Sequence, residues 1–556
     1  MRSLACSILL CAGLVLAAAA APAATYTVDS TADSGMGTLR QAILDANTNV
    51  NVVDTIEFDI AGPPYTITPM SQLPQITDPV TIDGYTQNGA TPNTASLGTN
   101  AVLLIEIDGS MAGAAHGLLI EHLTNLGAGT TIRGLVINGF NTNLYGAIRI
   151  NDDGSNVIEG NFIGTDPSGL MAKPNYDGIA TEFFAADNRI GGTTPAARNL
   201  ISGNSNRGIV LDTDDNTIEG NLIGTDRTGL AALGNAAGIV LFDFAHDNVI
   251  GGGNSFLSPA ANTIAGNLNG GISVLTGSTG HDIRSNKIGV GANGLTPIGN
   301  GPGSAILLSA DDTTIVANTI AGNNGGIFVG AGVSNTVIQS NVIGFPQLGN
   351  SGTGISVFGN NSLIGGLTPD LGNLIAGNGG SGIEIVGFMG GGIGNAILEN
   401  SIFDNDLLGI DLLLGGNNDQ PAPVLTAASN TTIDGTLTAA AATTYRLEFF
   451  ASRACDLSGG GEGEEFLTAF IGMTDGAGVL NFSVPSGATP NRPFITATAT
   501  DPSDNTSEFS NCARNPAAIV APAPALGAGG IALAVLVLTA IGWWSAVRQR
   551  RAVEPE

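Results

Sequence analysis

Basic residues are scarce in this sequence, and lysine is almost absent. The 556 residues include 18 Lys plus Arg against 47 Asp plus Glu, a formal net charge of −29, and Lys173 and Lys287 are the only lysines. Such a chain has no basic patch to neutralise phosphates, so the composition argues against nucleic acid as a partner. It also disfavours acidic polysaccharides, which would approach a surface of the same sign of charge.

Cysteine is equally rare, and the sequence lacks the common catalytic motifs. It contains no GxSxG, HExxH, P-loop or paired CxxC. Two of its four cysteines, Cys6 and Cys11, lie in an N-terminal segment in which Arg2 precedes an apolar stretch and an Ala-Pro-Ala exit. This order is typical of a secretory signal peptide, predicted over residues 1–24. The mature chain would keep Cys455 and Cys512, which predicts one disulfide formed outside the cytoplasm.

Glycine is abundant, with 81 residues, and helical periodicity is missing from the long middle of the chain. There, short apolar segments that each open with a small residue recur at intervals near 30 residues. Their opening residues are Gly117, Ala147, Gly178, Gly208, Gly238, Gly271, Ala305, Gly326, Gly354, Gly382 and Gly409. Most continue through a polar turn into a β-branched strand ending in Asn, which is a strand-and-turn pattern.

Repeats of this kind must stack, because a unit of two or three short strands cannot bury its own apolar face. Parallel pairing between coils predicts an all-β, right-handed parallel β-helix over residues 101–416. A β-propeller and leucine-rich repeats fit the repeat length and consensus less well. One asparagine falls at a fixed place in the coil and is expected to form a structural side-chain ladder. Its copies are Asn161, Asn221, Asn286, Asn318, Asn341 and Asn400.

Residues 25–100 are expected to form an N-terminal cap and the first strands. Thr38 and Gln41 have capping-box spacing, and Leu39, Ala42, Ile43 and Ala46 share one helical face. This short amphipathic helix is predicted to cover the open end of the stacked strands.

The segment GTLRQAILDAN (37–47) resembles the CSLREA-type N-terminal motif of secreted bacterial right-handed β-helix proteins, although Gly37 and Thr38 replace its Cys-Ser. LPQITDPVTIDGYTQ (73–87) and the IEGNxIGTD repeats at 158 and 218 are similar to segments of the same group. The resemblance implies a pectate-lyase-like solenoid. It implies no single activity, because that superfamily mixes lyases, hydrolases, adhesins and inert scaffolds.

The pattern changes after residue 416. Strand-like runs separated by Gly, Pro, Asp and Asn turns predict a small antiparallel β-sandwich at 417–515, immunoglobulin-like in architecture and stapled by Cys455 and Cys512. The module also resembles the C-terminal sandwich often joined to these β-helices.

Residues 516–556 form a Pro/Ala linker, an uncharged apolar run from Leu526 to Trp544, and a basic end at Arg548, Arg550 and Arg551. Two interpretations stay open for this tail. It is a permanent membrane anchor, or a cleaved sorting signal of the kind it resembles in Gram-negative envelope proteins.

Acidic pairs are the first place to look for catalysis or calcium binding. Asp152-Asp153, Asp214-Asp215 and Asp311-Asp312 all occupy one turn slot, however, and Asx-turn chemistry explains that slot without a substrate. The GHG and RIK motifs of galacturonase-like hydrolases are also absent.

One set of turn residues is the candidate site. The turns of three successive coils carry acidic and aromatic residues in register, at intervals of 30, where rings could cover sugar faces and carboxylates could accept sugar hydroxyls or bind Ca²⁺. The alternative is that some of the phenylalanines point into the core. We call this set the turn patch: Glu182, Phe183, Phe184, Asp187, Asp212, Asp214, Asp215, Phe242, Asp243, Phe244, His246 and Asp247.

Two functions follow from these features. The first is an exported cell-envelope scaffold or adhesin-like protein without catalytic activity that contacts glycans or cells. The alternative is a polysaccharide lyase or glycoside hydrolase acting at the turn patch. Catalytic residues are not assigned, no cofactor is expected apart from possible Ca²⁺, and the expected partners are a polysaccharide or cell-surface glycan and, through the tail, a membrane.

Overall fold

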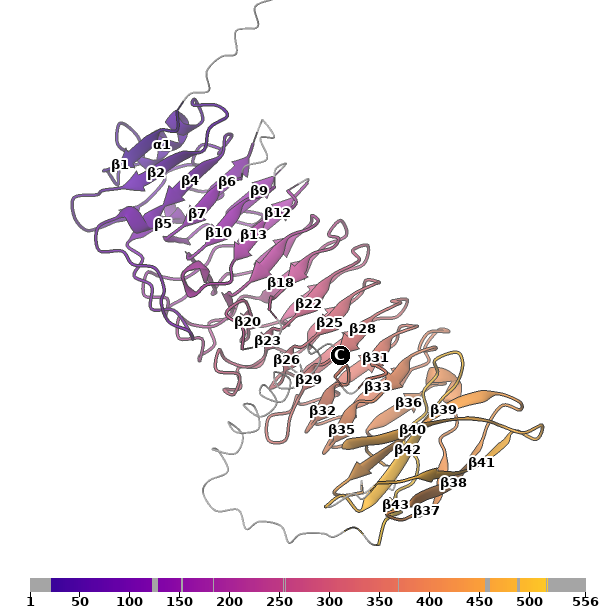
Figure 1. The fold of residues 1–556 in the computed structure, drawn as a ribbon. Coiled ribbons are helices and arrows are strands. Elements are labelled where there is room, and N and C mark those ends of the chain that lie inside the picture. Colours follow the sequence, from indigo (N-terminus) through magenta and orange to yellow (C-terminus); the bar gives the residue numbers. More distant parts are fainter. Residues whose placement is uncertain are drawn as a thin grey trace, which may run out of the picture.

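The computed structural model describes residues 22–122, 129–151, 154–183, 185–253, 255, 257–368, 370–455, 461–487, 491–516 and 518. Most of them form a right-handed parallel β-helix in which three sheets run the length of a rod, and an antiparallel module closes its C-terminal end (Figure 1). The predicted fold class is confirmed.

Sheet A has thirteen strands. They are β1 (Thr25–Val28), β2 (Asp54–Phe58), β4 (Val80–Asp83), β7 (Thr131–Arg133), β10 (Val157–Glu159), β13 (Arg189–Gly191), β16 (Thr217–Glu219), β19 (Val249–Ile250), β22 (Asp282–Arg284), β25 (Thr314–Val316), β28 (Val337–Gln339), β31 (Leu363–Gly365) and β34 (Ala396–Leu398).

Sheet B has twelve strands. They are β3 (Thr66–Ile67), β5 (Ile105–Asp108), β8 (Leu135–Asn138), β11 (Phe162–Ile163), β14 (Leu200–Ile201), β17 (Leu222–Ile223), β20 (Thr263–Ile264), β23 (Lys287–Ile288), β26 (Thr319–Ile320), β29 (Val342–Ile343), β32 (Leu374–Ala376) and β35 (Ser401–Phe403).

Sheet C has eleven strands, and each contains or directly follows one of the small residues that open the predicted repeats. They are β6 (Leu118–Glu121), β9 (Gly146–Asn151), β12 (Asp177–Glu182), β15 (Arg207–Leu211), β18 (Ala237–Leu241), β21 (Ile272–Val274), β24 (Ser304–Leu308), β27 (Gly325–Val329), β30 (Ile355–Val357), β33 (Ile383–Val386) and β36 (Ile410–Leu413).

Stacked isoleucines fill the interior of the rod. In sheet A, for example, Ile158, Ile190, Ile218 and Ile250 are successive register partners, and all are fully buried. β-Branched side chains fit this pleated, buried surface and have little rotamer freedom to lose. At most of the opening glycines a Cβ would meet the backbone of the next coil. At Gly208 it would lie 2.8 Å from the carbonyl oxygen of Gly238.

Asparagine ladders line the corners between sheets. One ladder contains all six predicted asparagines. In it, the Asn318 side-chain oxygen accepts hydrogen bonds from the backbone N–H and the side-chain amide of Asn286, the asparagine one coil earlier. The Asn318 side-chain amide also donates to the carbonyl of Ile283, one coil back. The structural interpretation is confirmed, and Asn199, Asn262 and Asn373 belong to the same ladder. A second ladder was not predicted; it comprises Asn175, Asn204, Asn235, Asn267, Asn300, Asn323, Asn350, Asn378 and Asn405.

The helix α1 (Leu39–Ala46) lies at the N-terminal end, beside β1 and β2 (Figure 1). Its predicted face is the buried one, and the Thr38 side chain accepts the N–H of Gln41. The Gln41 side chain bonds Asp45 instead of returning to Thr38, so the capping box is formed on one side. Short 3₁₀ turns complete the helical content: η1 (Gly84–Thr86), η2 (Gly109–Met111), η3 (Pro195–Ala197) and η4 (Gly416–Asp419).

The C-terminal module has a three-stranded and a four-stranded antiparallel sheet around one apolar core that both sheets line. Its strands are β37 (Val424–Ala428), β38 (Thr432–Thr438), β39 (Thr444–Ser452), β40 (Glu465–Met473), β41 (Val479–Pro485), β42 (Phe494–Thr500) and β43 (Ala513–Arg514). The predicted disulfide is confirmed, with Cys455 and Cys512 joined at a Cα separation of 6.1 Å.

Three carboxylates of this module accept hydrogen bonds from backbone N–H groups in the last coil, one at each of the three sheets. The Glu448 carboxylate accepts the N–H of Glu399 beside β34, and the Glu462 carboxylate accepts that of Asn405 beside β35. The Glu508 carboxylate accepts the N–H of Leu412 in β36. Backbone groups that would otherwise form an open sheet edge are thereby paired.

Candidate functional site

The outward face of sheet C brings three residues of the turn patch together. Thr181, Leu211 and Leu241 are successive register partners, so the residue that follows each occupies the same position one coil further along. Those residues are Glu182, Asp212 and Phe242, and all three line one pocket of about 240 Å³. The interval of 30 residues therefore placed them correctly.

Two arginines and an aspartate on the same strands complete this pocket, which we call the sheet C groove. The Arg149 guanidinium forms an ion pair with the Glu182 carboxylate on the next coil. Arg207 is held by Asp177, with Nε and Nη2 each 3.0 Å from a carboxylate oxygen. None of these three residues was predicted, because the predicted site comprised turn residues, whereas Arg149, Asp177 and Arg207 belong to strands β9, β12 and β15.

Phe242 gives the groove an aromatic wall. The Arg207 guanidinium carbon lies 5.1 Å from the centroid of the Phe242 ring, a cation–π contact that fixes both side chains. Leu144, Ala180 and Val210 supply apolar lining between the charged groups. An aromatic face beside fixed polar groups is the arrangement that binding sites use to orient a ligand.

Asp212 is the carboxylate of the groove without an ion-pair partner among the described residues. Burial raises its pKa, and the neighbouring Asp243 charge adds to the rise, while a backbone hydrogen bond from Phe244 and the charge of Arg149 oppose it. The groove therefore combines ion-paired carboxylates, at Asp177 and Glu182, with one carboxylate whose proton is held more firmly.

The remaining acidic residues of the turn patch build the corner beyond sheet C. Asp187, Asp215 and Asp247 have left-handed backbone with φ between 52° and 58°. Each donates its N–H to a carbonyl of the next coil, as Asp215 does to His246. The Asp214 carboxylate accepts the N–H of His246 at 2.8 Å. Aspartate tolerates this backbone and bonds it locally, so these residues serve as turn formers.

The other described acidic pair behaves in the same way. Asp312 has φ 54°, and the Asp311 carboxylate accepts the N–H of Ser334 at 2.7 Å. Asp152 and Asp153 lie outside the described residues. Within the described ranges, no group of three or more His, Cys, Asp or Glu side chains is close enough to hold a metal ion.

The aromatic residues of the turn patch that the structure describes do not enter the core. Phe183 is 62% exposed and Phe244 is 72% exposed, so the core-facing alternative is wrong for both, and Phe242 is half-buried over Arg207. Asp243 is exposed, and Phe184 lies outside the described residues. His246 is half-buried, and its Nδ1 has no hydrogen-bond partner among the described residues.

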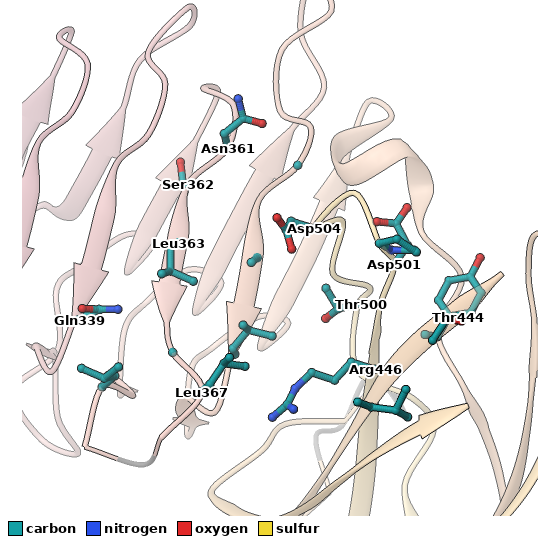
Figure 2. A pocket seen from close by; sticks show the side chains of 18 residues that line it. Gln339, Asn361, Ser362, Leu363, Leu367, Thr444, Arg446, Thr500, Asp501 and Asp504 are labelled. Atoms are coloured by element: carbon teal, nitrogen blue, oxygen red, sulfur yellow. The ribbon is translucent and has the colours of Figure 1, made fainter. Parts of the chain in front are cut away.

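A larger pocket of about 680 Å³ lies where the last coils meet the C-terminal module (Figure 2). Leu363 and Leu367 line it from the β-helix, and Arg446 and Asp501 line it from the module. Two of its charged groups are already engaged, and a third, Asp504, is exposed to solvent. Arg446 bonds Glu399 and Glu448, and the Asp501 carboxylate accepts N–H groups of its own turn. Unlike the sheet C groove, this pocket is lined by none of the residues of the turn patch.

No helix in the described part of the chain is long and apolar enough to cross a membrane. The predicted signal peptide up to residue 21 and the apolar run from Leu526 to Trp544 lie outside the described residues.

Comparisons with known proteins find no matching family model and no matching curated protein. Solved structures do match. The ORF18 protein of Geobacillus virus E2 is 10% identical, with 88% of this chain and 75% of that chain covered at a TM-score of 0.37. The enzymatically active domain of tailspike protein 2 from bacteriophage CBA120 is 11% identical, with 86% and 73% covered and a TM-score of 0.32.

The DFA-IIIase of Arthrobacter chlorophenolicus A6 is 13% identical, with 70% of this chain and 93% of that chain covered at a TM-score of 0.34. At identities this low, nothing about function passes from these proteins to this chain.

Proposed function

We propose that the chain is an exported envelope protein whose β-helix binds a glycan in the sheet C groove without cleaving it. The observation that carries the proposal is the convergence of Asp212, two ion-paired arginines and the Phe242 ring in one pocket, with the exposed rings of Phe183 and Phe244 beside it.

This chemistry suits sugars. A ring face supplies the apolar contact that a sugar's C–H face prefers, and carboxylates and guanidinium groups fixed by ion pairs present acceptors and donors to hydroxyls. Because the ion pairs already hold the arginine and carboxylate side chains, binding would cost little side-chain ordering. A glycan chain lying across the coils would meet the groove and then the exposed rings of the neighbouring turns.

The alternative is a polysaccharide lyase or glycoside hydrolase, and the raised pKa of Asp212 favours it. A general acid must hold its proton until it reaches the leaving group, and a second carboxylate, Glu182, occupies the position equivalent to Asp212 one coil away. Glu182 is bonded to Arg149, however, and the chain lacks the GHG and RIK motifs of galacturonase-like hydrolases, so binding without cleavage is preferred.

Export is supported by the Cys455–Cys512 disulfide, since such bonds persist mainly in oxidising compartments. We propose further that the tail is a sorting signal removed near residues 521–527. Mass spectrometry of the native protein tests this, and an intact Glu556 on the envelope-located protein would refute it.

The test of glycan binding uses the purified protein on a panel of polysaccharides, reading both binding and release of reducing ends. Phe242→Ala and Asp212→Asn should each weaken binding by about tenfold, the loss of a ring contact or of one charged hydrogen bond. Phe358→Ala is the matched control, because Phe358 occupies the same outward position of sheet C four coils away.

Equal losses in Phe242→Ala and Phe358→Ala would contradict binding at the groove. Release of reducing ends by the native protein, abolished in Asp212→Asn, would replace binding by the enzymatic alternative.

A further inference from the structure

The outward face of sheet B is covered over four successive coils. Val136, Phe162, Leu200 and Leu222 are successive register partners there, and they form an apolar cluster with Ala101 and Leu103 from the segment that crosses over them. In the next two coils the same row continues with Thr263 and then Lys287. A lysine thus lies two coils beyond the last apolar residue of this row.

Lys287 is buried without a counter-charge. It is 6% exposed, and its Nζ forms no hydrogen bond or ion pair with any residue that the structure describes. The other lysine, Lys173, is bonded to Glu106 and Asp108 at 2.9 Å each. In a chain with 47 acidic residues against 18 basic ones, an unpaired buried cation is a specific feature. Buried charges in proteins are ordinarily paired.

Arg198 is a second buried cation in the same place, also 6% exposed. Its guanidinium donates to backbone carbonyls only: Nε to Gly220, Nη1 to Gly98 and Ala95, and Nη2 to Ser96. These bonds use four of the five N–H groups of an arginine and leave its positive charge without a carboxylate partner. The guanidinium is therefore locked in position before any ligand arrives.

Both cations line one pocket of about 260 Å³. Leu97, Leu222 and Leu257 give it apolar walls, and the polar residues Ser258 and Asn293 also line it. Burial and the nearby Arg198 charge lower the pKa of Lys287 to about 8, so the ammonium form is held at a cost. A bound anion would remove that cost, because it would pair with both charges in a site of low dielectric.

We propose that this pocket binds a small oxyanion, a phosphate or carboxylate group, between the Lys287 ammonium and the Arg198 guanidinium. The Lys287 ammonium supplies three N–H donors. Arg198 supplies the one N–H group that is not bonded to a backbone carbonyl. The site lies on sheet B and is separate from the sheet C groove, so it does not depend on the proposed glycan binding.

The scarcity of lysine makes the test direct. Full-length protein labelled with ¹³C-lysine gives signals from two residues only, and Lys173→Met assigns them. Addition of millimolar inorganic phosphate, sulfate or acetate should shift the Lys287 signal, raise its pKa above about 8 and leave the Lys173 signal in place. The anion that shifts the Lys287 signal at the lowest concentration shows whether the pocket prefers a phosphate-like or a carboxylate-like group.

Calorimetry then measures the same anion on the variants. Lys287→Met should weaken binding at least about tenfold, Lys287→Arg should retain most of it, and Lys173→Met should leave it unchanged. Affinity should also fall as the pH rises above about 8, where Lys287 loses its proton.

An unshifted Lys287 signal in all three anions would overturn the proposal, and so would undiminished affinity in a folded Lys287→Met protein. Either result would leave Lys287 as a solvated amine that reaches water through the pocket.

Discussion

At the scale of single residues, Lys287 combines the proposed anion binding with a measurable cost to the stability of the fold. Its pKa in the folded chain, about 8, is below the ordinary lysine value of 10.5, so the unfolded chain binds more protons between these values. The free energy of unfolding should therefore rise with pH across that window, and the penalty is fully present below pH 8.

Lys287→Met is expected to remove this penalty and to raise the free energy of unfolding at pH 7 by a few kcal/mol at most, with a smaller gain at pH 10. Chemical denaturation at the two pH values, without phosphate or sulfate, measures it. Lys173→Met breaks ion pairs instead and should not stabilise the protein. If Lys287→Met raises the free energy of unfolding equally at both pH values, the cause is packing and not the removed charge.

Asn318 has the opposite role, because its side chain satisfies groups in three coils. It accepts from Asn286 and donates to Ile283 and Asn341. Asn318→Ala leaves these buried groups without partners and should lower the free energy of unfolding by about 2–4 kcal/mol. Asn324 is an exposed asparagine a few residues away, and Asn324→Ala should change the free energy of unfolding by less than about 0.5 kcal/mol. Equal effects in the two variants would mean that the ladder contributes little.

At the scale of elements, the strands and turns that recur at a nearly constant spacing could be predicted from the sequence. The eleven small residues found from the sequence correspond to the strands of sheet C. The six predicted asparagines each stand two residues after the end of a sheet A strand. The second ladder was not predicted although the sequence carries a signal for it: Asn235, Asn267 and Asn300 each follow a glycine and recur at intervals of 32 and 33 residues. Register between coils, which chain spacing alone does not give, brings them together.

The candidate site was predicted in part for the same reason. The interval between Glu182, Asp212 and Phe242 indicated a shared position, and the structure places them in one groove. Arg149 and Arg207 were missed because an outward residue on a strand looks in sequence like any exposed polar residue. Only the pairing of β9, β12 and β15 shows that they meet Glu182 and Asp177 across coils.

The C-terminal module acts as an element that ends the β-helix. Its carboxylates Glu448, Glu462 and Glu508 accept N–H groups in or beside the last strands of all three sheets. A chain ending at residue 419 would expose those edges and should self-associate, as measured by light scattering after size-exclusion chromatography. A chain ending at residue 518 keeps the module and is the control. A monomeric 1–419 chain would show that the module is dispensable as a cap.

At the scale of the whole molecule, the net charge of −29 should decide which glycans reach the sheet C groove. Within the groove, Arg149 and Arg207 are paired with Glu182 and Asp177, and Asp212 adds a negative charge, so no free cation is left there for a uronate. A neutral glycan meets no long-range field and should bind about equally well at low and high salt.

An acidic glycan is repelled by the whole rod, and salt screens that repulsion over about 10 Å at 0.1 M. Its binding should therefore be undetectable at low ionic strength and should strengthen as salt is added. Paired titrations of a neutral glucan and a polyuronate at about 0.02 M and about 0.5 M NaCl measure this difference. Strong polyuronate binding at low salt that weakens as salt is added would mean that a local cationic site outweighs the acidic surface. Loss of that binding in Lys287→Met would then place it at the pocket on sheet B.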